Sequence, residues 1–160
     1  MNLFEFNKPL LGRARGGVVV DDRVRIEHPL LKHSVAIPIG QIAAVVEPVG
    51  TESDPLLARD VRILTFASGG GGRTNLVLVF RSPVVIDGFK LGAQRVLAIS
   101  GRERRRGVYL DAVGVDVRDP QGLADALRAR RVPSSASLAS ELISLVARPP
   151  VPPSTSGGVR

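Results

Sequence analysis

The sequence predicts a mainly β domain: an antiparallel β-sandwich or barrel of about seven strands, capped by a C-terminal α-helix. Three observations support this fold class. Short apolar segments recur along the chain and are separated by Gly, Pro and Asp residues. A clearly marked helix comes only after these segments. No helical segments alternate with the strands, which argues against a parallel, doubly wound sheet.

The expected strands are short and follow one another closely. Arg23–His28 alternates apolar and polar residues, as a half-buried strand does, and Asp21–Asp22 before it suits a tight turn. The segments 61–67 and 75–80 are predicted to pair as a hairpin, with Gly69–Gly72 at its tip. The full set of expected strands is 18–20, 23–28, 35–37, 42–47, 61–67, 75–80, 84–86, 94–100 and 108–117.

The helix is predicted to begin after Asp119, whose carboxylate can cap free backbone N–H groups. Pro120 suits the first helical turn, where a missing N–H costs nothing. Basic residues in the last turn favour the helix dipole, and Val132-Pro133 ends the helix. The expected apolar stripe is Leu123, Ala124, Ala126 and Leu127, and the expected basic last turn is Arg128, Arg130 and Arg131.

The domain itself is predicted to span residues 17–132. Residues 1–16 form an N-terminal arm whose aromatic side chains pack either as an edge strand or as a hydrophobic arm. Residues 133–148 have the spacing of a short extra helix, with an apolar face from Leu138 to Val146 that covers the core or docks a partner. Residues 149–160, rich in Pro, Ser and Gly, are expected to be a disordered tail.

Composition excludes several functions. The chain has 160 residues and no Cys, which rules out disulfides, thiolate catalysis and cysteine-ligated metals. It lacks an apolar run of about 18 residues, so no transmembrane segment is expected. The absence of Cys fits a reducing cytoplasm, which is the expected location. The net charge of +7 favours anionic partners: lipid headgroups, nucleic acid or an acidic protein surface. The alternative explanation of the charge is a compositional bias of the genome, which places Arg wherever a polar surface residue is needed.

The strongest candidate site is an arginine cluster between two expected strands, in a segment, 101–107, that is predicted to be a loop. Such a cluster concentrates positive charge and suits an anion or lipid headgroup. A solvated charged loop is the other interpretation. The candidate anion- or lipid-binding residues are Arg102, Arg104, Arg105 and Arg106, joined by Arg13 and Arg15 if they lie on the same face.

No catalytic or metal-binding motif is present. Gly69–Gly72 is not followed by the Lys and helix that a phosphate loop requires, so a hairpin tip is expected there. His28 and His33 have no carboxylate cluster beside them and are expected to be ordinary surface or edge residues. The chain is therefore predicted not to be an enzyme and to carry no cofactor or metal.

Two phrases are similar to the pleckstrin-homology-like (PH-like) family, in particular its small bacterial members: Val35-Ala36-Ile37-Pro38-Ile39-Gly40-Gln41-Ile42 and Val113-Gly114-Val115-Asp116-Val117-Arg118-Asp119-Pro120. The resemblance covers about residues 16–132. Trp is absent, and Arg23 and Arg25 do not reproduce the basic spacing of phosphoinositide-binding members.

The resemblance implies a non-enzymatic module that binds peptides, proteins or lipids. A protein or peptide partner is the first expectation. The second is peripheral binding to anionic lipids at the inner face of the membrane. Nucleic acid is third, because only 4% of the residues are aromatic and could stack on bases.

Overall fold

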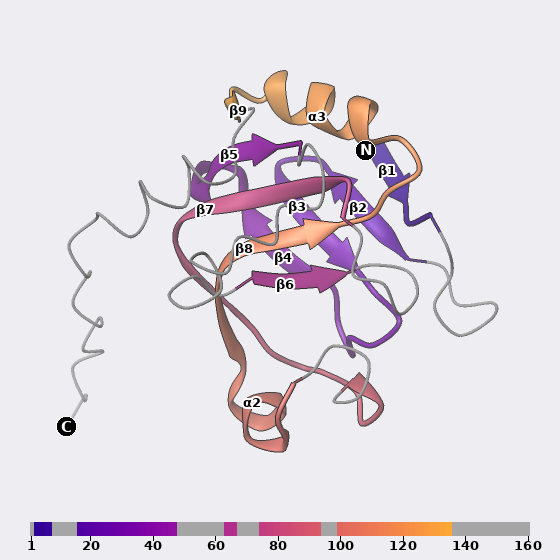
Figure 1. The fold of residues 1–160 in the computed structure, drawn as a ribbon, viewed down its shortest axis with the longest axis vertical. Helices are drawn as coiled ribbons and strands as arrows, with labels where there is room; N and C mark the ends of the chain where they lie inside the picture. Colours follow the sequence, from indigo (N-terminus) through magenta and orange to yellow (C-terminus); the bar gives the residue numbers. More distant parts are fainter. Residues whose placement is uncertain (1, 8–15, 48–62, 67–73, 94–98, 136–160) are drawn as a thin grey trace.

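The computed structural model describes residues 2–7, 16–47, 63–66, 74–93 and 99–135, and within them the chain is mainly β, as predicted (Figure 1). The first sheet is antiparallel, in chain order: β1 (Asn2–Glu5), β2 (Gly17–Val20), β3 (Arg23–Glu27) and β4 (Val35–Pro38). The second, in spatial order, contains β6 (Ile63–Phe66), β8 (Val108–Val115), β7 (Leu76–Ile86), β5 (Ile42–Val46) and β9 (Ser134–Ser135). The helices are η1 (Ile39–Gln41), α2 (Gly101–Arg106) and α3 (Pro120–Arg128).

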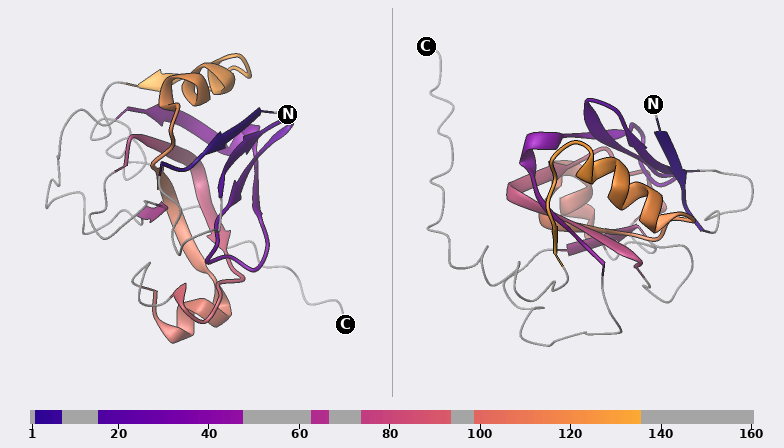
Figure 2. Two further views of the ribbon diagram at one scale, coloured as in Figure 1. Left: turned by 90° about the vertical axis from the view of Figure 1, so that its right-hand side faces the viewer. Right: turned by 90° about the horizontal axis from the view of Figure 1, so that it is seen from above.

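The core lies between the two sheets and is closed at one end by α3 (Figure 2). Val24 and Ile26 of β3 belong to one buried cluster with Phe66 and Phe80 of the second sheet. The buried side chains of α3 are those that the helical stripe predicted: Leu123, Ala124, Ala126 and Leu127. Burial of each leucine contributes about 1.5–3 kcal/mol, so α3 is part of the core.

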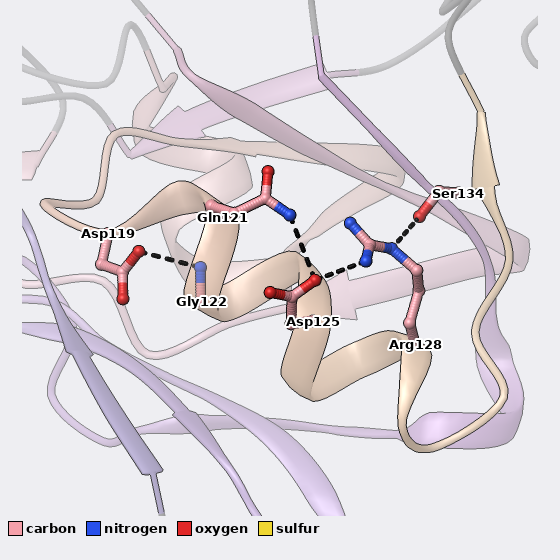
Figure 3. Close-up of polar contacts among 6 residues, drawn as sticks. All are labelled: Asp119, Gln121, Gly122, Asp125, Arg128 and Ser134. Atoms are coloured by element: carbon pink, nitrogen blue, oxygen red, sulfur yellow. Dashed lines mark hydrogen bonds and ion pairs between the residues drawn. The ribbon is translucent and has the colours of Figure 1, made fainter.

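The start of α3 is as the sequence predicts. The Gly122 N–H donates to Asp119 Oδ1 at 2.8 Å, and Pro120 occupies the first turn. Farther along, the Asp125 carboxylate accepts hydrogen bonds from Gln121 and Arg128, and the Arg128 Nε donates to Ser134 Oγ (Figure 3).

The end of α3 differs from the prediction. The helix stops at Arg128, so Arg130 and Arg131 lie beyond its last turn. Arg131 adopts a φ of 66°, and the Val132 N–H donates back to the Leu127 carbonyl, which ends the helix and buries Val132.

The predicted Asp21–Asp22 turn is confirmed between β2 and β3. The Arg23 N–H donates to Asp21 Oδ1 at 2.9 Å. The Arg130 guanidinium donates to the Asp21 carbonyl at 2.5 Å and to the Ala126 carbonyl at 2.9 Å. Arg130 therefore ties the end of α3 to a turn of the first sheet.

The predicted hairpin between 61–67 and 75–80 is wrong. Strand β8 lies between β6 and β7, parallel to β6 and antiparallel to β7. A second parallel pair joins β5 and β9, so the sheet is mixed rather than antiparallel. The second half of β8, Ala112–Val115, is buried throughout, as expected for a strand in the interior of a sheet.

Other expected boundaries also shift. Strand β7 continues through Pro83, because the register slips between Val79 and Val84 and leaves the proline out of the ladder. Ser134–Ser135 pair with β5, so no second helix begins at Ser134. Ile99 and Ser100 are not in a strand. The predictions for 94–98, Gly69–Gly72, the Leu138–Val146 face and the 149–160 tail concern residues outside the described ranges.

The N-terminal residues 2–5 form an edge strand, since β1 pairs with β2. Phe6 is buried and Phe4 is half-buried, so these aromatics pack onto the domain. In the part of the chain that the structure describes, no helix has the length and apolar character needed to cross a bilayer.

Candidate functional site

The four candidate arginines lie on a short helix, α2, and the prediction of a loop at 101–107 is wrong. Ser100 and Glu103 form a capping box: the Glu103 N–H donates to Ser100 Oγ at 3.1 Å, and the Ser100 N–H donates to Glu103 Oε2 at 2.9 Å. Gly107 ends the helix with a φ of 85°. The Ser-x-x-Glu spacing of Ser100 and Glu103 is the sequence signal that identifies this helix.

The charges of α2 are available to a ligand. Arg102, Arg105 and Arg106 are exposed and Arg104 is half-buried. None of the four side chains forms an ion pair with another described residue. The Glu103 carboxylate bonds to the Ser100 backbone. Positive charge in the last turn suits the helix dipole, but the arginines also repel one another unless an anion screens them.

Helical geometry divides the arginines into two pairs. Arg102 and Arg106 are four residues apart and share one face of α2. Arg104 and Arg105 face a hollow of about 520 Å³ beside the helix. Lys32, from the connection between β3 and β4, lies on the wall of the same hollow. We call α2, the segment 87–91 and Lys32 together the basic end.

The basic end lies opposite α3, at the far end of the sandwich (Figures 1 and 2). The lower parts of β7 and β8 run down to it, and α2 connects with the start of β8 (Figure 1). The fold therefore places α3 in the core at one end of the sandwich. At the other end, α2 lies outside the core and buries none of its residues.

Three large apolar side chains are exposed beside α2. Leu91 is 78% exposed, Tyr109 54% and Val85 44%. Val85 and Tyr109 are directly opposite each other on β7 and β8. Leu91 lines the hollow with Arg104 and Arg105. We call Val85, Leu91 and Tyr109 the apolar rim; exposed apolar groups next to cations are typical of interaction surfaces.

The apolar rim is held close to α2 by glycine. Gly107 needs its left-handed backbone, and a Cβ there would lie 2.7 Å from Val85 Cγ1. The end of the helix consequently packs directly on Val85, and charged and apolar groups share one small surface.

His28 is a correction to the sequence analysis, because it is buried rather than at the surface. Its ring lies between Phe6 and Phe66, with ring centroids 5.6 and 4.9 Å away. Its Nδ1 accepts the Leu30 N–H at 3.2 Å. Burial lowers the pKa of His28 from 6.5 to about 4, so the ring is neutral at pH 7. His33 is exposed, as expected.

The structure brings Arg102, Arg104, Arg105 and Arg106 together, while Arg13 and Arg15 lie outside the described residues. Sequence reasoning missed Lys32, Leu91 and Tyr109, since these come from separate segments and carry no shared motif. In the described part of the chain, no group of three His, Asp or Glu residues is arranged to hold a metal ion.

Comparison with known proteins provides no relative. No protein-family model, no curated protein and no solved structure matches this chain. The geometry described above is therefore the basis for any functional conclusion.

Proposed function

We propose that this chain is a non-enzymatic binding module that attaches peripherally to an anionic membrane surface through its basic end. One observation carries the proposal: arginines of α2 without an ion pair to any described residue lie beside exposed apolar side chains, Leu91 in the hollow and Val85 at Gly107. Each cation near such a surface contributes about 1 kcal/mol. Leu91 and Tyr109 add apolar contact at the depth of the headgroups, where Tyr is favoured.

The exposed arginines and apolar side chains favour membrane attachment over a protein or peptide partner, which the sequence alone favours. A protein or peptide partner is therefore the competing outcome. Nucleic acid is less favoured, because Tyr109 is the single exposed Phe, Tyr or Trp side chain in the described residues, whereas stacking needs several. The proposed location is the cytoplasm, at the inner face of the membrane.

The fold that we infer for this module is PH-like. Two packed sheets and a C-terminal helix across one end support it. The two parallel strand pairs, β6–β8 and β5–β9, depart from an all-antiparallel plan. The basic end occupies the end of the sandwich that the helix leaves uncovered (Figure 2).

Cosedimentation with liposomes tests the function. The protein is mixed with neutral and anionic vesicles at low and near-physiological salt. We expect binding to anionic vesicles, weakened by salt because the Debye length falls to about 8 Å. The double variant Arg105→Glu/Arg106→Glu should lose most of this binding, by about tenfold or more. The variant Leu91→Ser should reduce binding at both salt concentrations.

A charge-matched control separates a local site from general basicity. Arg23 and Arg131 are exposed, and both lie near the Asp21 turn at the α3 end. The double variant Arg23→Glu/Arg131→Glu has the same net charge as the α2 variant and should retain binding. Equal losses in both variants would contradict a site at the basic end, and no vesicle binding by the wild type would favour a protein partner.

A further inference from the structure

The hollow beside α2 combines an excess of positive charge with a fixed floor. Its volume is about 520 Å³, within the range of small-ligand sites. Among the described residues, three cations and one carboxylate line it, together with Phe89, the exposed Leu91 and the backbone at Gly88. The cations are Lys32, Arg104 and Arg105, and the carboxylate is Asp87.

The floor is held by backbone pairing between two distant segments. The Lys32 N–H donates to the Gly88 carbonyl at 2.7 Å, and the Lys90 N–H donates to the Leu30 carbonyl at 2.8 Å. Leu31 and Phe89 form an isolated β-bridge and are both buried. Lys32 is thus fixed at its backbone in the wall of the hollow that Arg104 and Arg105 also line.

The charge pattern indicates one small anion rather than a polyanion. Two guanidinium groups and an ammonium group lining one hollow suit the oxygens of a phosphate, because Arg forms paired hydrogen bonds to such groups. The Asp87 carboxylate repels a second anionic group in the same hollow, and it can accept a hydrogen bond from a hydroxyl group of the ligand. These features favour a single phosphate with an uncharged, hydroxyl-bearing remainder.

We propose that this hollow binds a phosphate monoester, either as a lipid headgroup or as a soluble phosphate ester. The inference rests on the proposed function where the ester belongs to a lipid, and it names the group that the membrane-facing surface recognises. Arg104, Arg105 and Lys32 bind the phosphate oxygens, while Arg102 and Arg106, on the other face of α2, contribute charge without contacting the ester.

Two measurements separate the sources. In solution, the wild type is titrated with glycerol 3-phosphate, and the amide NMR signals of Lys32 and Gly88 are followed. On membranes, binding to vesicles that contain phosphatidic acid, a monoester, is compared with binding to phosphatidylglycerol, a diester, at matched surface charge. We expect saturable shifts of the amide signals in the first measurement. In the second, we expect about a tenfold preference for phosphatidic acid, which is the contribution of about one hydrogen bond to a charged group.

The matched variants lie on one helix. Arg104→Gln/Arg105→Gln should abolish the preference and the NMR shifts. Arg102→Gln/Arg106→Gln removes the same charge from the same helix and should retain both. Lys32→Gln, on a separate segment, repeats the test without altering α2, and Asp87→Asn should strengthen binding of the ester severalfold, because it removes a repelling charge.

The outcomes distinguish the two proposals. Equal effects of both arginine pairs, with no headgroup preference, would overturn the phosphate site and leave membrane attachment standing. Saturable binding of glycerol 3-phosphate without any vesicle binding would support the site and overturn the proposed function. Absence of both kinds of binding would overturn both.

Discussion

Helices α3 and α2 both end in arginines, and the two use those residues in opposite ways. At the α3 end, Arg128 bonds to Asp125 and Ser134, and Arg130 bonds to two backbone carbonyls. At the α2 end, none of the arginines pairs with a described residue. The stripe of α3 is buried, whereas α2 buries nothing. Arginine content alone therefore does not distinguish the two ends; the presence or absence of local partners does.

The largest expected difference between the two ends concerns their leucines. Leu127→Ala should lower the free energy of unfolding by about 2–5 kcal/mol, because Leu127 is fully buried and its loss leaves a cavity. Leu91→Ala at the basic end should change it by less than about 0.5 kcal/mol, since Leu91 is exposed. Urea denaturation measures both. Similar losses in the two variants would mean that Leu91 also supports the fold.

The second prediction concerns acid stability. His28 has a folded pKa of about 4 and an ordinary value of 6.5. Above pH 6.5 neither state of the protein protonates it. Between pH 6.5 and 4 the unfolded chain takes up a proton that the folded chain does not, so stability falls by about 3 kcal/mol. The other resolved shift, a lowered pKa of about 2 at Asp21 that the Arg23 backbone hydrogen bond mainly causes, acts at lower pH.

Chemical denaturation from pH 7.5 to 4 measures this dependence. His28→Gln should remove the His28 part of the slope, whatever its effect on stability at pH 7.5. His33→Gln changes an exposed histidine and should leave the slope intact. Equal slopes in the wild type and both variants would show that the pKa of His28 in the folded state is close to its ordinary value of 6.5.

The sequence predicted those parts of the fold that depend on neighbouring residues. Asp119, Pro120 and the stripe of α3 are local signals, and the Asp21–Asp22 turn is another. The order of strands is not local: β8 lies between β6 and β7, and its pairing with β6 joins residues almost 50 positions apart, such as Ile63 and Ala112. His28 was misplaced for the same reason, since Phe6 and Phe66, which cover it, are distant in sequence.

The candidate site shows the same division. The arginine cluster is contiguous and was found as a run of charge. Its helical form was missed because α2 has no apolar stripe, although Ser100 and Glu103 carry the capping signal. Lys32 reaches the same hollow through backbone pairing with Gly88, a contact between residues far apart in the chain. The hollow therefore could not be predicted from sequence periodicity.

A smaller effect is expected from single arginines at the two ends. Arg130→Gln should lower stability by about 1–2 kcal/mol, because it removes charged hydrogen bonds to the Asp21 and Ala126 carbonyls. Arg106→Gln should leave stability within about 0.5 kcal/mol of the wild type. Thermal unfolding of both variants checks this. A large loss from Arg106→Gln would indicate a structural partner for that side chain.

The smallest effect should come from the helix caps, and it separates local from global stability. Asp119→Ala and Ser100→Ala each remove one cap, worth about 1 kcal/mol. Because α3 is part of the core, Asp119→Ala should lower global stability by that amount. Because α2 buries no residue, Ser100→Ala should leave global unfolding unchanged and should speed hydrogen exchange at the Gly107 N–H, which bonds to the Glu103 carbonyl, by about fivefold. If Ser100→Ala lowered global stability as much as Asp119→Ala, α2 would be a structural element like α3, and its arginines would have to be reconsidered as part of the fold rather than as a binding surface.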